Sequence, residues 1–97
     1  MTHLASAVLW EVLLRREPGL ARLQSEAMAV RDEGGRSFCA NRLWYIRFEP
    51  QLRQLVGKSS EGDDPLLRTP EAYELSRQIL YRLLPDCRNC ICVPWES

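Results

Sequence analysis

The fold is decided by the stretch Phe38–Val56, whose sequence is FCANRLWYIRFEPQLRQLV. At about 100° per residue, one set of its side chains shares a single arc of a helical projection, and the arc keeps its phase across Pro50. We therefore expect a helix that is bent or restarted at the proline. The arc, which we expect to form the core, consists of Asn41, Trp44, Tyr45, Phe48, Leu52, Leu55 and Val56.

A second apolar patch lies on another side of this predicted helix and consists of Cys39, Leu43 and Ile46. A helix with apolar residues on two sides requires neighbours on both, so we expect it to occupy the centre of the fold. A buried strand over Leu43–Phe48 is the alternative, because tryptophan, tyrosine, isoleucine and phenylalanine suit a pleated surface. The continuous helical arc favours the helix.

Three further helices are predicted from capping residues and from residues that break helices. Thr2 caps the first helix and Pro18 ends it, while Gly34 stops the second. Thr69 and Pro70 begin the last helix as an N-cap and a first-turn proline. The sequence therefore predicts a small all-α domain of four antiparallel helices, which cover residues 3–16, 19–33, 38–56 and 70–84.

The remaining segments are predicted to be a mobile surface loop and an ordered tail. The loop, 57–68, begins with the polar sequence GKSSEGDD, which has no apolar periodicity. Its apolar end is expected to fold back onto the core through Pro65, Leu66 and Leu67. The tail, 85–97, is predicted to be non-helical but packed, because it contains Ile91, Val93 and Trp95. A chain of this length, residues 1–97, is expected to form one domain.

Composition and charge argue against several classes of function. The thirteen basic and thirteen acidic residues cancel, so the chain lacks the positive charge of most nucleic-acid-binding proteins. The apolar run Leu4–Leu14 is shorter than the roughly 20 residues that span a bilayer, and no secretory signal is recognisable. We therefore expect a cytoplasmic protein with no membrane partner and no nucleic-acid partner.

The first predicted helix carries more apolar residues than one buried face can hold. Nine of the eleven residues from Leu4 to Leu14 are apolar, and only Glu11 and Arg15 form a narrow polar strip. Such a helix is either enclosed by its own domain or meets another chain with its second face. The candidate partner-binding residues are Val8, Leu9, Trp10, Leu13 and Leu14.

The cysteines offer an alternative site, because three of the four form a C-x-x-C-x-C cluster after the last helix. With a fourth ligand from Cys39, His3 or Asp86, they have the ligand number and type that zinc requires. A thiol-redox role is disfavoured because the end of a helix raises the pKa of a nearby thiol. Packed free thiols are the simplest interpretation. The zinc hypothesis involves Cys39, Cys87, Cys90 and Cys92.

No catalytic constellation is visible in the sequence. His3 is the only histidine, so a Ser-His or Cys-His pair is not easily assembled. Asn41 lies inside the apolar arc, where its amide must bond to a neighbouring backbone or to a ligand. The sequence predicts an accessory protein without catalytic activity or cofactor, which binds another protein or itself. The alternative is a metal-binding or thiol-redox module.

Overall fold

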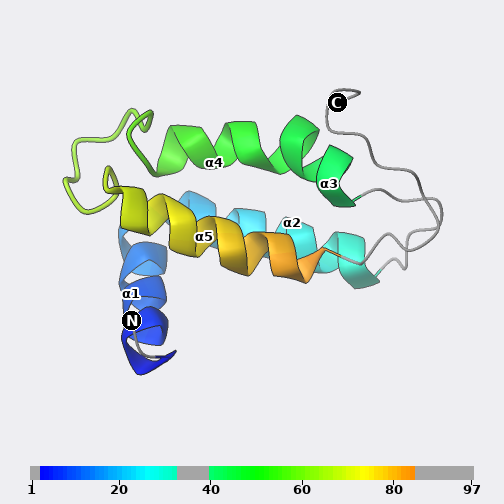
Figure 1. Ribbon diagram of the computed structural model, residues 1–97, viewed down its shortest axis with the longest axis horizontal. Coiled ribbons are helices and arrows are strands. Elements are labelled where there is room, and N and C mark those ends of the chain that lie inside the picture. Colours follow the sequence, from blue (N-terminus) through cyan, green and yellow to red (C-terminus); the bar gives the residue numbers. More distant parts are fainter. Residues whose placement is uncertain (1–2, 33–39, 85–97) are drawn as a thin grey trace.

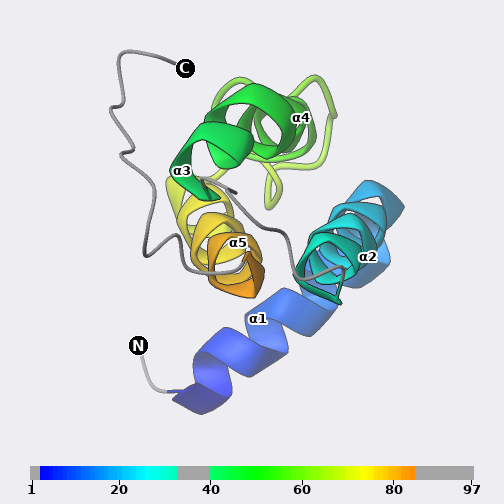
Figure 2. The same cartoon turned by 90° about the vertical axis from the view of Figure 1, so that its right-hand side faces the viewer.

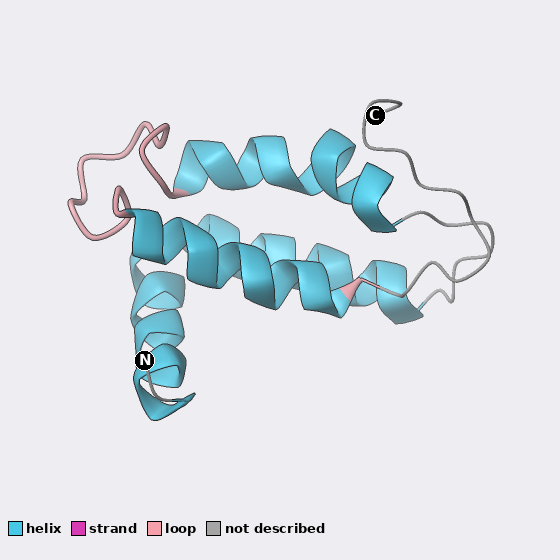
Figure 3. Cartoon of the chain, in the orientation of Figure 1, coloured by secondary structure: helices cyan, strands magenta, loops and turns pink. Residues whose placement is uncertain are grey.

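The computed structural model describes residues 3–32 and 40–84, and every regular element in these two ranges is helical (Figure 3). The all-α prediction is confirmed, and the alternative of a strand over Leu43–Phe48 is wrong. The bounds predicted for the first, second and last helices agree with the observed ones to within about one residue. The predicted start of the 38–56 helix lies outside the described residues. The elements are α1 (His3–Arg16), α2 (Pro18–Asp32), α3 (Ala40–Leu43), the π-helical turn η1 (Trp44–Phe48), α4 (Glu49–Leu55) and α5 (Pro70–Leu83).

Three helical segments run side by side in Figure 1: α2, α5, and the continuous segment formed by α3, η1 and α4. The segment α3–η1–α4 runs opposite to α2 and α5, as short antiparallel connections predict. Helix α1 does not join this arrangement. It contacts both α2 and α5 but crosses below them in Figure 2.

The crossing of α1 follows from the single residue that joins it to α2. The Glu17 N–H donates to the Leu13 carbonyl at 2.9 Å, and the Glu17 carbonyl accepts from the Leu20 N–H at 3.0 Å. The Glu17 carboxylate also caps α2, because its Oε1 accepts from the Gly19 N–H at 3.0 Å. One residue engaged in both helices cannot reverse the chain, so the predicted antiparallel pairing is wrong for α1 and α2.

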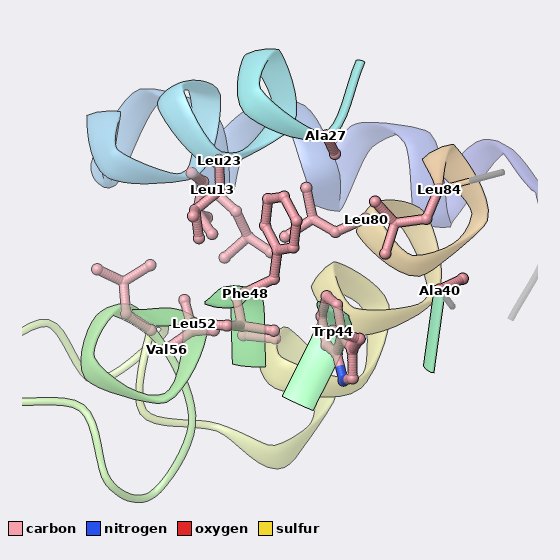
Figure 4. Close-up of a cluster of buried hydrophobic side chains, with 13 residues drawn as sticks. Leu13, Leu23, Ala27, Ala40, Trp44, Phe48, Leu52, Val56, Leu80 and Leu84 are labelled. Atoms are coloured by element: carbon pink, nitrogen blue, oxygen red, sulfur yellow. The ribbon is translucent and has the colours of Figure 1, made fainter. Parts of the chain in front are cut away.

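The core lies between α2, α5 and the segment α3–η1–α4, and α1 covers one side of it (Figure 4). Trp44 and Phe48 are buried there, as predicted, with their ring centroids 6.4 Å apart. The Trp44 ring also meets the edge of Tyr81 on α5 at 5.7 Å. Fully buried side chains from four helices surround this pair: Leu13, Leu20, Leu23, Ala27, Leu52 and Leu80.

Helices α2 and α5, and not the stretch 38–56, occupy the central position. Each contacts the other and also α1 and α4. The prediction of a central 38–56 helix rested on a second apolar patch, but Ile46 in that patch is 55% exposed and Leu43 is half-buried. The third member, Cys39, lies outside the described residues. One apolar stripe of the segment therefore faces the core while the other side faces solvent.

The bend expected at Pro50 is a π turn that precedes it. The Glu49 N–H donates to the Trp44 carbonyl, five residues back, and Pro50 has no N–H to continue the ladder. The side-chain amide of Gln51 donates to the Arg47 carbonyl at 2.7 Å. A π turn rotates less per residue than an α-helix, so Tyr45 no longer shares a face with Phe48 and Leu52. Tyr45 is half exposed, although it was predicted to lie in the core.

The segment between α4 and α5 is tied to both ends of the fold. The Gly57 N–H donates to the Leu67 carbonyl at 2.7 Å, and the Asp64 carboxylate accepts from the Arg16 guanidinium of α1 at 3.0 Å. Leu67 is buried, which confirms that the end of this loop folds back onto the core. The mobility of residues 57–68 stays a prediction, and the predicted tail, 85–97, lies outside the described residues.

Candidate functional site

The candidate partner-binding residues of α1 fall into different environments. Leu13 is fully buried in the core. Leu9, Trp10 and Leu14 pack against the core with part of their surface exposed, and Val8 is 52% exposed. The helix is therefore anchored by Leu13 and its partly buried neighbours, while Val8 remains exposed on the other side.

A groove of about 320 Å³ lies between α1 and α5. Trp10, whose side chain is partly exposed, forms part of its wall. The lining consists of Ser6, Ala7 and Trp10 from α1 and of Leu75, Gln78, Ile79 and Arg82 from α5.

A larger pocket, of about 460 Å³, lies where the end of α4 meets the beginning of α5. Its volume falls in the range of small-molecule sites. Sequence reasoning missed this pocket, because its walls come from segments that meet only in the folded chain. We call it the α4–α5 pocket, and it is lined by Arg53, Val56, Gly57, Lys58, Ser59, Pro70, Tyr73 and Glu74.

A nearly buried carboxylate fixes two walls of the α4–α5 pocket. Glu49, in the first turn of α4, is only 8% exposed. Its Oε2 accepts a hydrogen bond from the Tyr73 hydroxyl at 3.0 Å and forms an ion pair with the Arg53 Nε at 2.8 Å. A buried carboxylate requires such partners. Glu49 therefore joins α4 to α5 and holds the Tyr73 ring and the Arg53 guanidinium in place.

The Tyr73 hydroxyl acts as a donor in this network over a wide pH range. Burial, the hydrogen bond to Glu49 and the negative charge of Glu49 together raise the pKa of Tyr73 to about 12. Arg77 and Arg53 act weakly against this shift. At neutral pH the Tyr73 hydroxyl therefore stays protonated and donates a hydrogen bond to Glu49.

The side chain of Glu74, on the rim of the pocket, is bonded to other side chains of its own helix, α5. The Arg77 Nε donates to Glu74 Oε2 at 3.3 Å, the Arg77 Nη2 contacts Oε1, and the Gln78 amide also donates to Oε1 at 3.3 Å. The hydrogen bond from Arg77 lowers the pKa of Glu74 from its ordinary value. The carboxylate is therefore ionised at neutral pH, and both of its oxygens are engaged.

Gly57 forms the bottom of the turn that leads into the pocket. Its φ of 92° lies in the left-handed region that glycine adopts at low cost. A Cβ at this position would also lie 3.2 Å from the Cβ of Tyr73. Close approach of the backbone to Tyr73 and the sharp turn both require glycine here, and together they direct Lys58 and Ser59 to the pocket wall.

The other predicted site residues do not converge on a site within the described ranges. Asn41 is half-buried and lines neither of the two pockets above. The zinc candidates Cys39, Cys87, Cys90 and Cys92 lie outside the described residues, so the zinc hypothesis stays a prediction. Within residues 3–32 and 40–84, no three histidine, cysteine, aspartate or glutamate side chains are grouped to hold a metal ion.

Comparisons with protein-family models, with curated proteins and with solved structures found no match for this chain. In the described part of the chain, no helix combines the length and the apolar character needed to cross a membrane.

Proposed function

We propose that this protein is a small non-catalytic interaction protein that binds another protein, or a second copy of itself, through the outer side of α1. One observation carries the proposal. Val8 is 52% exposed on the same helix whose Leu13 is fully buried, so α1 is firmly anchored and still presents an apolar surface. Leu9, Trp10 and Leu14 are partly exposed along the edges of the buried side of the helix.

The groove beside Trp10 indicates the chemistry of the partner. An amphipathic helix that lies on α1 can place one apolar side chain in the groove, against Trp10 and Ile79. Arg82 at the same groove is an exposed cation that suits an acidic residue next to the apolar side chain. A second copy of α1 supplies an apolar helix of the same kind, in the symmetric arrangement common among homodimers.

The test compares two variants that place a charge on an exposed apolar residue. Val8→Glu changes α1, and Met28→Glu changes an equally exposed residue of α2, which is 48% exposed. Neither side chain is needed for the core, so both variants are expected to fold. Light scattering at micromolar concentration measures self-association, and affinity capture from the native host measures binding of another protein.

We expect Val8→Glu to lose the dimer or the captured partner, and Met28→Glu to retain it. Equal behaviour of the two variants would contradict the proposal, as would a monomer that captures no partner.

The alternative, a metal-binding module, has its own test. Less than about 0.2 equivalents of zinc or iron per chain, in protein purified without chelator or metal-affinity tag, would exclude it.

A further inference from the structure

We infer that the α4–α5 pocket is a binding site for a small amphipathic anion, a molecule with an apolar body and one carboxylate. This inference goes beyond the proposed partner surface on α1 and rests on different residues. The apolar body would lie against Val56, Pro70 and the Tyr73 ring. The carboxylate would lie at the rim, between Arg53 and Lys58.

The expected charge of the ligand follows from which charged side chains of the pocket already have partners. Among the described residues that line the pocket, Glu74 is the only carboxylate, and both of its oxygens are engaged by Arg77 and Gln78. Of the two cations in the lining, Lys58 is exposed and has no ion pair among the described residues. The pocket therefore has an available positive charge and no available negative one.

Arg53 contributes donors even though it is paired. Its Nε is occupied by Glu49 at 2.8 Å, but its side chain is 57% exposed. A guanidinium has further N–H donors, which are suited to a planar carboxylate. Because Glu49 fixes the orientation of Arg53 from below, binding of an anion does not require the guanidinium to be ordered first.

The Tyr73 wall of the pocket is fixed in a similar way. The Tyr73 hydroxyl is bound to Glu49 at 3.0 Å, and Gly57 approaches the base of the Tyr73 side chain closely. The ring therefore has one position, and it presents an apolar face to the pocket. A hollow with apolar walls and a few fixed polar groups is the usual form of a small-molecule site.

The experiment titrates the isotopically labelled full-length protein with octanoate and, separately, with octylamine, and follows backbone amide shifts. The two probes have the same apolar chain and opposite charges. We expect octanoate to shift the amides of residues 56–59 and 73–74 in a saturable way, and octylamine to leave them unchanged. Saturation by octylamine at these residues, or no saturation by either probe, would overturn the inference.

Two variants then test the assigned cation. Lys58→Gln removes the available charge and is expected to weaken octanoate binding about threefold to fivefold, the upper part of the range for one exposed ion pair. Arg68→Gln removes an exposed cation from the same loop that does not line the pocket, and is expected to change binding less than about twofold. An equal effect of both variants would show general electrostatic attraction and would overturn the site. Since neither residue lies on α1, the outcome is independent of partner binding.

Discussion

Helix α1 and the segment α3–η1–α4 are both rich in apolar residues, but the fold uses them differently. The segment fully buries Phe48 and Leu52, and nearly all of Trp44, between α2 and α5. Of the α1 residues whose side chains are described, only Leu13 is fully buried. The difference shows that apolar content alone does not predict burial. A helix whose apolar residues form one stripe can bury that stripe against two neighbouring helices. A helix with apolar residues on all sides leaves one side uncovered.

The largest effect is expected for Phe48→Ala. Phe48 is fully buried and stacked on Trp44, so its truncation leaves a large cavity that the surrounding helices cannot fill. We expect a loss of about 3–5 kcal/mol in the free energy of unfolding, a large share of the total of a small domain. Denaturant unfolding followed by circular dichroism measures it, and an unchanged midpoint would show that this stripe is not the core.

Leu13→Ala tests how strongly α1 is attached. Leu13 is fully buried, but α1 packs on the rest of the fold from one side, so the cavity can partly collapse. We expect a cost of about 2–3 kcal/mol, in the lower part of the range for buried leucines. The same unfolding experiment applies. If the cost equals or exceeds that of Phe48→Ala, α1 is as much a part of the core as the segment α3–η1–α4.

The two regions also differ in their polar ties, which Tyr73→Phe tests. The segment is tied to α5 through the nearly buried Glu49, whereas α1 is tied to the loop through the more exposed Arg16–Asp64 pair. We expect Tyr73→Phe to cost about 1 kcal/mol at pH 7, since the hydroxyl is only partly shielded from water. Arg16→Gln is the matched comparison and is expected to cost less than about 0.5 kcal/mol. Equal costs would remove the distinction.

The contribution of Tyr73 depends on pH with a definite sign. Its pKa is raised to about 12 in the folded chain, against about 10 in the unfolded chain. The stabilisation is therefore complete below pH 10 and is lost as the pH rises toward 12, because the unfolded chain then releases the proton more readily. The difference in stability between wild type and Tyr73→Phe should narrow over this interval. A constant difference would contradict the raised pKa.

The smallest effect is expected for Val8→Ala, on the outer side of α1. Half of the Val8 side chain is already exposed, and alanine has the higher helix propensity. We expect a change of less than about 0.5 kcal/mol in either direction. Thermal unfolding of the dilute protein measures it, and a loss above about 1 kcal/mol would place Val8 in an interface even under those conditions.

The helices were predictable from the sequence because their ends carry local signals. Thr69 accepts a hydrogen bond from the Ala72 N–H at 3.1 Å, as its N-cap position predicts. The failures came from features of the backbone that no single residue signals. The exposure of Tyr45 and Ile46 depends on a π turn that has no single-residue signature, and the position of α1 depends on a one-residue connection.

The candidate sites were less predictable than the helices, for a related reason. The apolar excess of α1 could be read from its sequence, but which of its residues remain exposed could not. The α4–α5 pocket had no signal, because Glu49 and Tyr73 are 24 residues apart and meet only after α4 and α5 pack. Glu49 follows Arg47 and Phe48 in the sequence, and nothing local marked it as a buried partner.

The π turn between Trp44 and Phe48 makes this segment a place where the chain can tolerate the deletion of one residue. A π turn contains one residue more than an α-helix needs at the same place. Removal of a single residue from it, Ile46 for example, leaves a regular helix whose two halves can keep their own neighbours. Length variants of this protein are therefore expected at residues 44–48, with the flanking Ala40 and Leu52 still in the core. In a helix without such a turn, the same deletion would rotate one half away from its packing partners.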